Sequence, residues 1–149
     1  MRKTYPYILV PAEKGQTLVE IVISLGIVLL LVAGLIVATT SAIHISDQGR
    51  LRSLAIQYAQ EGLELSRQLR DSNWGTFQAK SGLWCLDKAD AWTPAGVSCL
   101  VNIDNTFTRG VTFTWNGAAS RMEVTSTVSW QDGSTTHQSQ LTTYFTQWQ

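Results

Sequence analysis

The strongest pattern in the chain is a continuous apolar run over residues 21–43. These 23 residues carry no charged side chain and are mainly Ile, Val and Leu. As an α-helix with a rise of roughly 1.5 Å per residue the run would be about 35 Å long, which exceeds the roughly 30 Å hydrocarbon core of a bilayer. The pattern therefore predicts a membrane-spanning helix.

A second, one-sided pattern follows the polar stretch at residues 46–49. Apolar or small residues recur at alternating spacings of four and three, as on one face of an amphipathic helix. We expect the helix to continue through this stretch, with Gly49 marking a bend, and to end near residues 71–73. The residues of this stripe are Leu51, Ala55, Tyr58, Gly62, Leu65 and Leu69.

The C-terminal half changes to a period of two, which is typical of half-buried strands. Turn signals at Asn116-Gly117 and Asp132-Gly133 separate three such runs. An antiparallel meander of three strands is therefore expected, with the helical stripe covering its apolar face. Two shorter strands are expected over residues 83–86 and 97–103. The alternating positions are Phe107, Val111, Phe113 and Trp115, then Met122, Val124, Val128 and Trp130, then Leu141, Thr143 and Phe145.

These patterns together predict an α+β fold in which a long N-terminal helix packs on a small antiparallel sheet.

The charges around the apolar run predict its direction in the membrane. Arg2, Lys3 and Lys14 precede it and only Glu13 opposes them, which favours a cytoplasmic N-terminal segment and an outer C-terminal part. A formal net charge of zero argues against a nucleic-acid partner, which would require a basic excess on one face.

Both cysteines, Cys85 and Cys99, fall in the outer part of the chain, 14 positions apart. A disulfide is permitted there, and a loop of that length would contribute roughly 3 kcal/mol on the chain-entropy model. Neither cysteine has a CxxC partner or a histidine at ligand spacing, so the pattern does not favour a metal or redox site.

The segment before the apolar run differs from an ordinary secretory signal, in which cleavage follows the apolar part. Here Gly15 precedes the run, and a lone carboxylate, Glu20, stands at its start. Placing a carboxylate in lipid costs about 2.5–3.5 kcal/mol on insertion scales, so a partner is expected for it. The alternative is that Glu20 lies at the headgroup interface, where the helix macrodipole favours it.

Residues 14–20, Lys-Gly-Gln-Thr-Leu-Val-Glu, resemble the prepilin cleavage and methylation motif of type IV pilins and type II secretion pseudopilins. The resemblance implies that prepilin peptidase cuts after Gly15, that Gln16 becomes the methylated N-terminus, and that Glu20 guides assembly. The family most often begins its mature chain with Phe, where this sequence has Gln16. Residues 59–64 and 70–74 look similar to the end of the helix in PilV-type minor pilins.

The resemblance implies four parts: a cleaved leader (1–15), a membrane-spanning assembly half of the helix (16–45), an amphipathic half (46–72) and an extracytoplasmic β domain (73–149). The expected function is that of a minor pilin or pseudopilin in a type IV pilus or type II secretion-like filament. Its expected partners are the peptidase, other subunits, the inner-membrane assembly platform and, before assembly, membrane lipid. Two alternatives are an adhesion or DNA-uptake domain at a filament tip and an uncleaved single-pass membrane protein with an outer binding domain.

No catalytic motif, phosphate-binding glycine loop or metal-ligand spacing is present in the sequence, so neither enzymatic activity, a cofactor nor a metal is expected. His44 and His137 are too separated to suggest a ligand pair, and Asp87 and Asp90 lack the alternating oxygen ligands of a calcium loop. The tryptophans admit two interpretations, a glycan-stacking surface or packing in the core and at strand edges, of which packing is favoured. Those considered are Trp84, Trp92, Trp115, Trp130 and Trp148.

Overall fold

The structure of the chain, a computed structural model, describes residues 16–100 and 103–147. The chain divides into two compact units, Met1–Ser46 and Asp47–Gln149. One helix, α1 (Gln16–Ser72), has residues in both units. Its helical backbone continues through Gly49, where the sequence suggested a bend, and it ends within the predicted range at Ser72.

The first unit consists, in its described part, of the N-terminal half of α1. Its aliphatic side chains from Leu18 to Ile45 are largely exposed. Two polar side chains among them are satisfied locally, because the Thr39 hydroxyl donates to the Leu35 carbonyl and the Thr40 hydroxyl donates to the Ile36 carbonyl. Within the described residues, α1 is the one helix that is long and apolar enough to cross a membrane.

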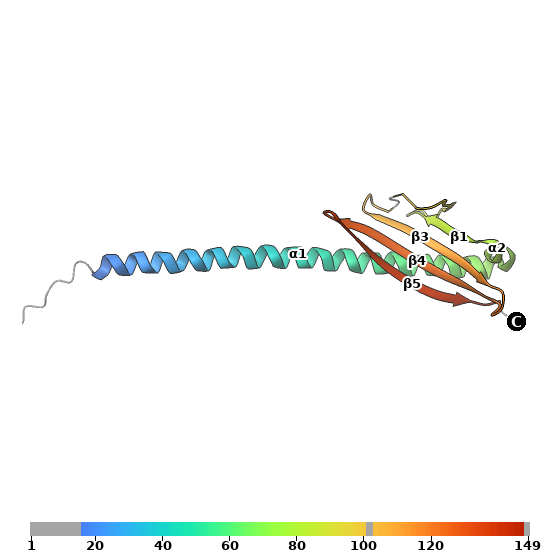
Figure 1. Cartoon of the computed structure of the whole chain (residues 1–149), viewed down its shortest axis with the longest axis horizontal. Helices are drawn as coiled ribbons and strands as arrows, with labels where there is room; N and C mark the ends of the chain where they lie inside the picture. The colour runs from blue at the N-terminus through green and yellow to red at the C-terminus, as the bar shows by residue number, and fades with distance from the viewer. Residues whose placement is uncertain (1–15, 101–102, 148–149) are drawn as a thin grey trace, which may run out of the picture. The chain divides into compact units, whose positions relative to one another are not determined.

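The second unit contains a five-stranded antiparallel sheet in the order β2-β1-β3-β4-β5 (Figure 1). A short helix, α2 (Trp74–Ala79), connects α1 to the sheet. The predicted α+β fold and the meander of three long strands are confirmed. The strands are β1 (Gly82–Leu86), β2 (Trp92–Pro94), β3 (Phe107–Asn116), β4 (Arg121–Asp132) and β5 (Thr135–Phe145).

The second short strand was predicted in the wrong place. It forms at Trp92–Pro94 and not over residues 97–103, because a tight turn after β1 reverses the chain early. The Asp87 carboxylate accepts hydrogen bonds from the backbone N–H groups of Ala89 and Ala91, which stabilises that turn. Of the range 97–103, Ile103 makes a single bridge to Phe107, and residues 101–102 lie outside the described structure.

The amphipathic stripe of α1 packs on the sheet as predicted, because each of its six residues is buried or partly buried. Two apolar clusters form the core. The first cluster consists of Phe77, Leu86, Val111, Phe113, Met122, Val124 and Phe145. The second consists of Ala55, Ala59, Ile103, Phe107, Val128 and Trp130.

A polar layer lies between these clusters in the strand register. On β3, Arg109 stands between Phe107 of the second cluster and Val111 of the first, and on β4 Ser126 stands between Val128 and Val124. Arg109 and Ser126 are fully buried. A buried polar layer in an otherwise apolar core requires specific partners for its groups.

Candidate functional site

The predicted processing site falls at the edge of the described structure. Gly15 and the side chain of Gln16 lie outside the described residues, and the backbone of Gln16 begins helix α1. Glu20 follows about one helical turn later and its side chain is exposed.

Glu20 lies in a shallow groove on the surface of α1. The described residues offer it neither an ion pair nor a hydrogen bond, and its neighbours are mostly apolar or small. This carboxylate is therefore open to a partner from outside the described part of the chain. The residues that line the groove are Thr17, Glu20, Ile21, Ser24, Leu25 and Val28.

The two cysteines are joined by a disulfide, with their Cα atoms 5.5 Å apart. Cys85 lies on β1 and Cys99 lies in the segment after β2, so the bond ties that segment to the sheet. Gly110 on the neighbouring β3 makes room for this arrangement. A Cβ atom there would lie 2.9 Å from Leu83 Cδ1 and 3.5 Å from Cys99 Sγ.

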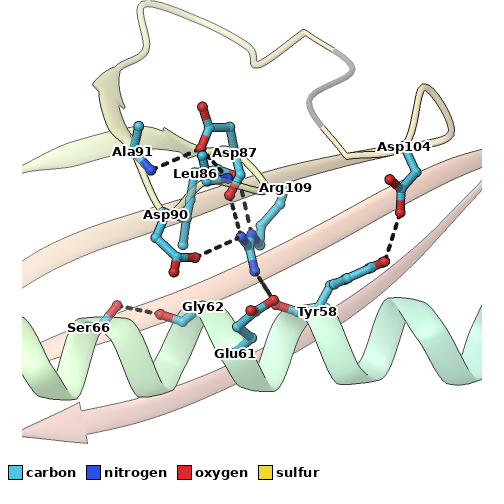
Figure 2. Close-up of polar contacts among 11 residues, drawn as sticks. Tyr58, Glu61, Gly62, Ser66, Leu86, Asp87, Asp90, Ala91, Asp104 and Arg109 are labelled. Atoms are coloured by element: carbon cyan, nitrogen blue, oxygen red, sulfur yellow. Dashed lines mark hydrogen bonds and ion pairs between the residues drawn. The ribbon is translucent and has the colours of Figure 1, made fainter.

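The main polar cluster of the second unit centres on Arg109, which joins helix α1 to the turn after β1 (Figure 2). Its Nη1 donates to Glu61 Oε2 at 2.7 Å and to the Tyr58 carbonyl at 3.2 Å. Its Nε donates to the Leu86 carbonyl at 3.2 Å, and its Nη2 donates to the Asp87 carbonyl at 2.6 Å. The guanidinium is thus hydrogen-bonded on several sides, which its fork of donors permits.

Arg109 is buried, whereas the carboxylates near it are partly exposed to solvent. The Arg109 side chain is 0% exposed, whereas that of Glu61 is 47% exposed. Asp90 Oδ1 lies 4.0 Å from Nη2 and is also half exposed. The buried cation is therefore balanced by two carboxylates that remain in contact with water, which lowers the desolvation cost of the pair.

The sequence interpretation missed Arg109 as a buried residue, although the signal was present. Strict alternation through Phe107, Val111 and Phe113 places position 109 on the same inward face. A charged residue on an apolar face indicates a buried cation with a carboxylate partner. Glu61 is 48 positions away, however, and the local pattern could not identify it.

A second polar contact holds the segment before β3. The Asp104 carboxylate accepts a hydrogen bond at 3.1 Å from the Tyr58 hydroxyl (Figure 2). It accepts a second one from Lys88 Nζ. The hydrogen bond from the Lys88 ammonium holds the pKa of Asp104 below its ordinary value of 3.8. The Tyr58 hydroxyl thus joins α1 to the segment before β3, and Glu61 joins α1 to Arg109 on β3 itself.

These clusters connect helix α1 to β3, to the turn after β1 and to the segment before β3. In the part of the chain that the structure covers, no three His, Cys, Asp or Glu side chains are grouped to hold a metal ion. His137 stacks on Trp130 at a ring-centroid distance of 5.6 Å and lies far from His44 in the sequence.

No family model matches this sequence, and no curated protein or solved structure matches it either.

Proposed function

We propose that this chain is a structural subunit, a minor pilin or pseudopilin, of a type IV pilus or type II secretion-like filament. In this proposal prepilin peptidase cuts the chain after Gly15 on the cytoplasmic side, and Gln16 becomes the mature N-terminus. The observation that carries the proposal is Glu20, an exposed carboxylate about one turn into an exposed apolar helix, with no partner in the described residues.

A partner for Glu20 follows from the chemistry of the cut. Cleavage after Gly15 removes three basic residues and one acidic residue and creates an α-amino group on Gln16. In a stack of helices, that ammonium of one subunit would pair with Glu20 of its neighbour. In surroundings of low dielectric constant an unpaired carboxylate is costly, so the pair favours one axial register over others.

The exposed aliphatic surface of the first unit has two successive environments in this proposal. Before assembly it contacts lipid, and after assembly it contacts the same helix of other subunits. Both environments are apolar, so transfer between them costs little through the hydrophobic effect, and packing and the Glu20 pair decide the outcome. The disulfide suits an oxidising compartment outside the cytoplasm.

The experiment that tests the proposal is the N-terminal mass of the protein from cells with and without prepilin peptidase. A chain that begins at Gln16 only when the peptidase is present supports the proposal, and the mass of one added methyl group identifies methylation. The control is Gly15→Leu, which places a large side chain at the cleavage junction and should retain the leader.

A chain that begins at Met1 in both strains contradicts the proposal. The protein would then be an uncleaved single-pass membrane protein whose outer domain binds a partner. Methylation is separate from this outcome, because a chain cut after Gly15 can keep an unmodified amino group.

A further inference from the structure

A pocket of about 640 Å³ lies at one end of the sheet, beside helix α2 and the turn between β3 and β4. This volume is within the range of roughly 300–1,000 Å³ that is typical of pockets for small ligands. None of the polar clusters described above contributes to it. Its principal lining residues are Trp74, Gln78, Trp115, Ser120, Thr146 and Gln147.

Two indole rings form the aromatic part of this pocket. The ring centroids of Trp74 and Trp115 are 6.1 Å apart, and the planes meet at 72°. Trp74 also contacts Phe77, at 5.6 Å, and Phe77 is fully buried in the core. Trp115 is 37% exposed although it continues the inward face of β3. The core therefore fixes one indole while the other presents aromatic surface to solvent.

The polar side chains of the pocket are uncharged, and several of them are free to form hydrogen bonds with a ligand. The side-chain amides of Gln78 and Gln147 have no hydrogen-bond partner among the described residues, and neither do the indole N–H groups of Trp74 and Trp115. Each amide can donate and accept, and each indole can donate. None of the lining residues carries a charge. Arg121, next in sequence to Ser120, is engaged elsewhere, with its guanidinium 4.3 Å from the Tyr144 ring centroid.

This combination selects among ligand classes. A phosphate or carboxylate ligand would require a cation in the lining, and a purely apolar ligand would leave the amides unpaired. A neutral sugar satisfies both parts of the pocket: its C–H face packs on an indole ring, and its hydroxyls donate to and accept from amides and hydroxyls.

We infer that this pocket binds a neutral saccharide, with Trp115 as the stacking surface and Gln78 and Gln147 as hydrogen-bonding residues. The inference rests on the second unit alone and does not depend on cleavage after Gly15. In a filament subunit, such a pocket would give the filament a contact to glycans.

The test uses the full chain, labelled with ¹⁵N and held in phosphocholine micelles, because a maltoside detergent would itself supply sugar. Indole N–H resonances are followed during titration with glucose, galactose, N-acetylglucosamine and their β-1,4-linked disaccharides. Glucuronic acid and sialyllactose serve as anionic comparisons. The expected result is a saturable shift of the Trp74 and Trp115 resonances with at least one neutral sugar, while the Trp92 resonance stays in place.

Two variants and a matched control separate binding from folding. Trp115→Ala should weaken binding about tenfold by removing the aromatic surface. Gln78→Ala should weaken it while the remaining indole resonances keep their positions. Gln68→Ala is the matched control for Gln78→Ala: it removes an exposed glutamine amide on helix α1, outside the pocket, and should leave binding unchanged. The inference is overturned if no neutral sugar gives a saturable shift, if an anionic sugar binds more tightly, or if Trp115→Ala binds as the wild type does.

Discussion

Gly62 of helix α1 lies against Ser126 of β4, so closely that a Cβ atom on Gly62 would be 2.6 Å from Ser126 Oγ. The contact lies in the polar layer between the two apolar clusters, where Ser66 and Ser126 are fully buried. Ser66 donates to the Gly62 carbonyl at 2.8 Å, but the Ser126 hydroxyl has no partner among the described residues. Small side chains thus allow the helix to approach the sheet here at the expense of one unsatisfied hydroxyl.

Gly62→Ala and Ser126→Ala should therefore be coupled. Ser126→Ala alone should raise the free energy of unfolding by up to about 1 kcal/mol, because it removes a buried hydroxyl without a partner. Gly62→Ala gains helix propensity but collides with Ser126 Oγ, and with that atom gone the nearest contacts are ordinary ones at 3.4 and 3.5 Å. We expect Gly62→Ala to be more favourable by about 1 kcal/mol when it is combined with Ser126→Ala than when it is made alone. Urea unfolding of the full chain in micelles, followed by tryptophan fluorescence, measures this; strict additivity would contradict it.

Replacement of Arg109 should destabilise the second unit strongly. Arg109→Ala should lower the free energy of unfolding by about 2–4 kcal/mol, because it leaves a cavity and removes the side-chain donor to the Leu86 carbonyl. The Asp87 carbonyl also loses its bond from Arg109 but keeps one from the Asp90 backbone N–H. Arg109→Lys should recover only part of this loss, since a single ammonium cannot reach acceptors on both sides. The same urea unfolding measures both variants, and equal stability of Arg109→Lys and wild type would contradict the assigned hydrogen bonds.

Replacement of Glu61 tests how much its carboxylate contributes to balancing the buried charge of Arg109. Glu61→Gln should cost about 1–2 kcal/mol, less than for a fully buried pair, because Glu61 is half exposed. The matched control is Glu64→Gln on the same helix, which breaks the exposed pair with Arg67. That control should change stability by less than about 0.5 kcal/mol.

The disulfide should contribute roughly 3 kcal/mol to the stability of the second unit on the chain-entropy model. A variant with both Cys85→Ala and Cys99→Ala should therefore unfold at a lower urea concentration than the oxidised wild type. Addition of a reducing agent should lower the wild-type midpoint and leave that of the variant unchanged. Two free thiols in the untreated protein, detected by mass analysis after alkylation, would argue against the bond.

Asp104 should make stability depend on pH in the acid range. Its folded pKa is below 3.8, mainly through the Lys88 hydrogen bond, so the folded state binds fewer protons there than the unfolded state. Stability from this group is therefore complete above roughly pH 5 and is lost as pH falls through the folded pKa. The stability difference between wild type and Asp104→Asn should shrink on acidification. A carboxyl NMR titration that places the pKa of Asp104 at or above 3.8 would contradict this.

The helices and strands with regular spacing of apolar residues could be predicted, because that spacing is visible in neighbouring residues of the sequence. The stripe that ends at Leu69 and the alternation in β3 and β4 lead directly to the helix, the meander and the buried faces. Position 109 followed the same alternation, but its role depends on Glu61 and on carbonyls of a distant turn. Such partners are set by tertiary structure and have no local signal.

The connecting segment misled the prediction for a different reason. The apolar residues Val97 and Leu100 suggested a strand, yet they are 96% and 85% exposed. The turn after β1 decides the pairing instead, through the Asp87 carboxylate. Helix α2 was missed although Asn73, directly before it, is a favourable N-cap residue, whose side chain accepts a hydrogen bond from the Thr76 backbone N–H.

Glu20 supplies the prediction that bears most directly on assembly. Glu20→Ala should leave cleavage after Gly15 largely intact, because the junction itself is unchanged, but it should lower incorporation into filaments. Glu20→Gln is the sharper variant, since it keeps size and hydrogen bonding and removes only the charge that would pair with the α-amino group of a neighbouring subunit. The mature protein is compared in sheared filament and membrane fractions, with Asp47→Asn as a control carboxylate on the same helix. Normal incorporation of Glu20→Gln would show that the charge of Glu20 has no part in assembly.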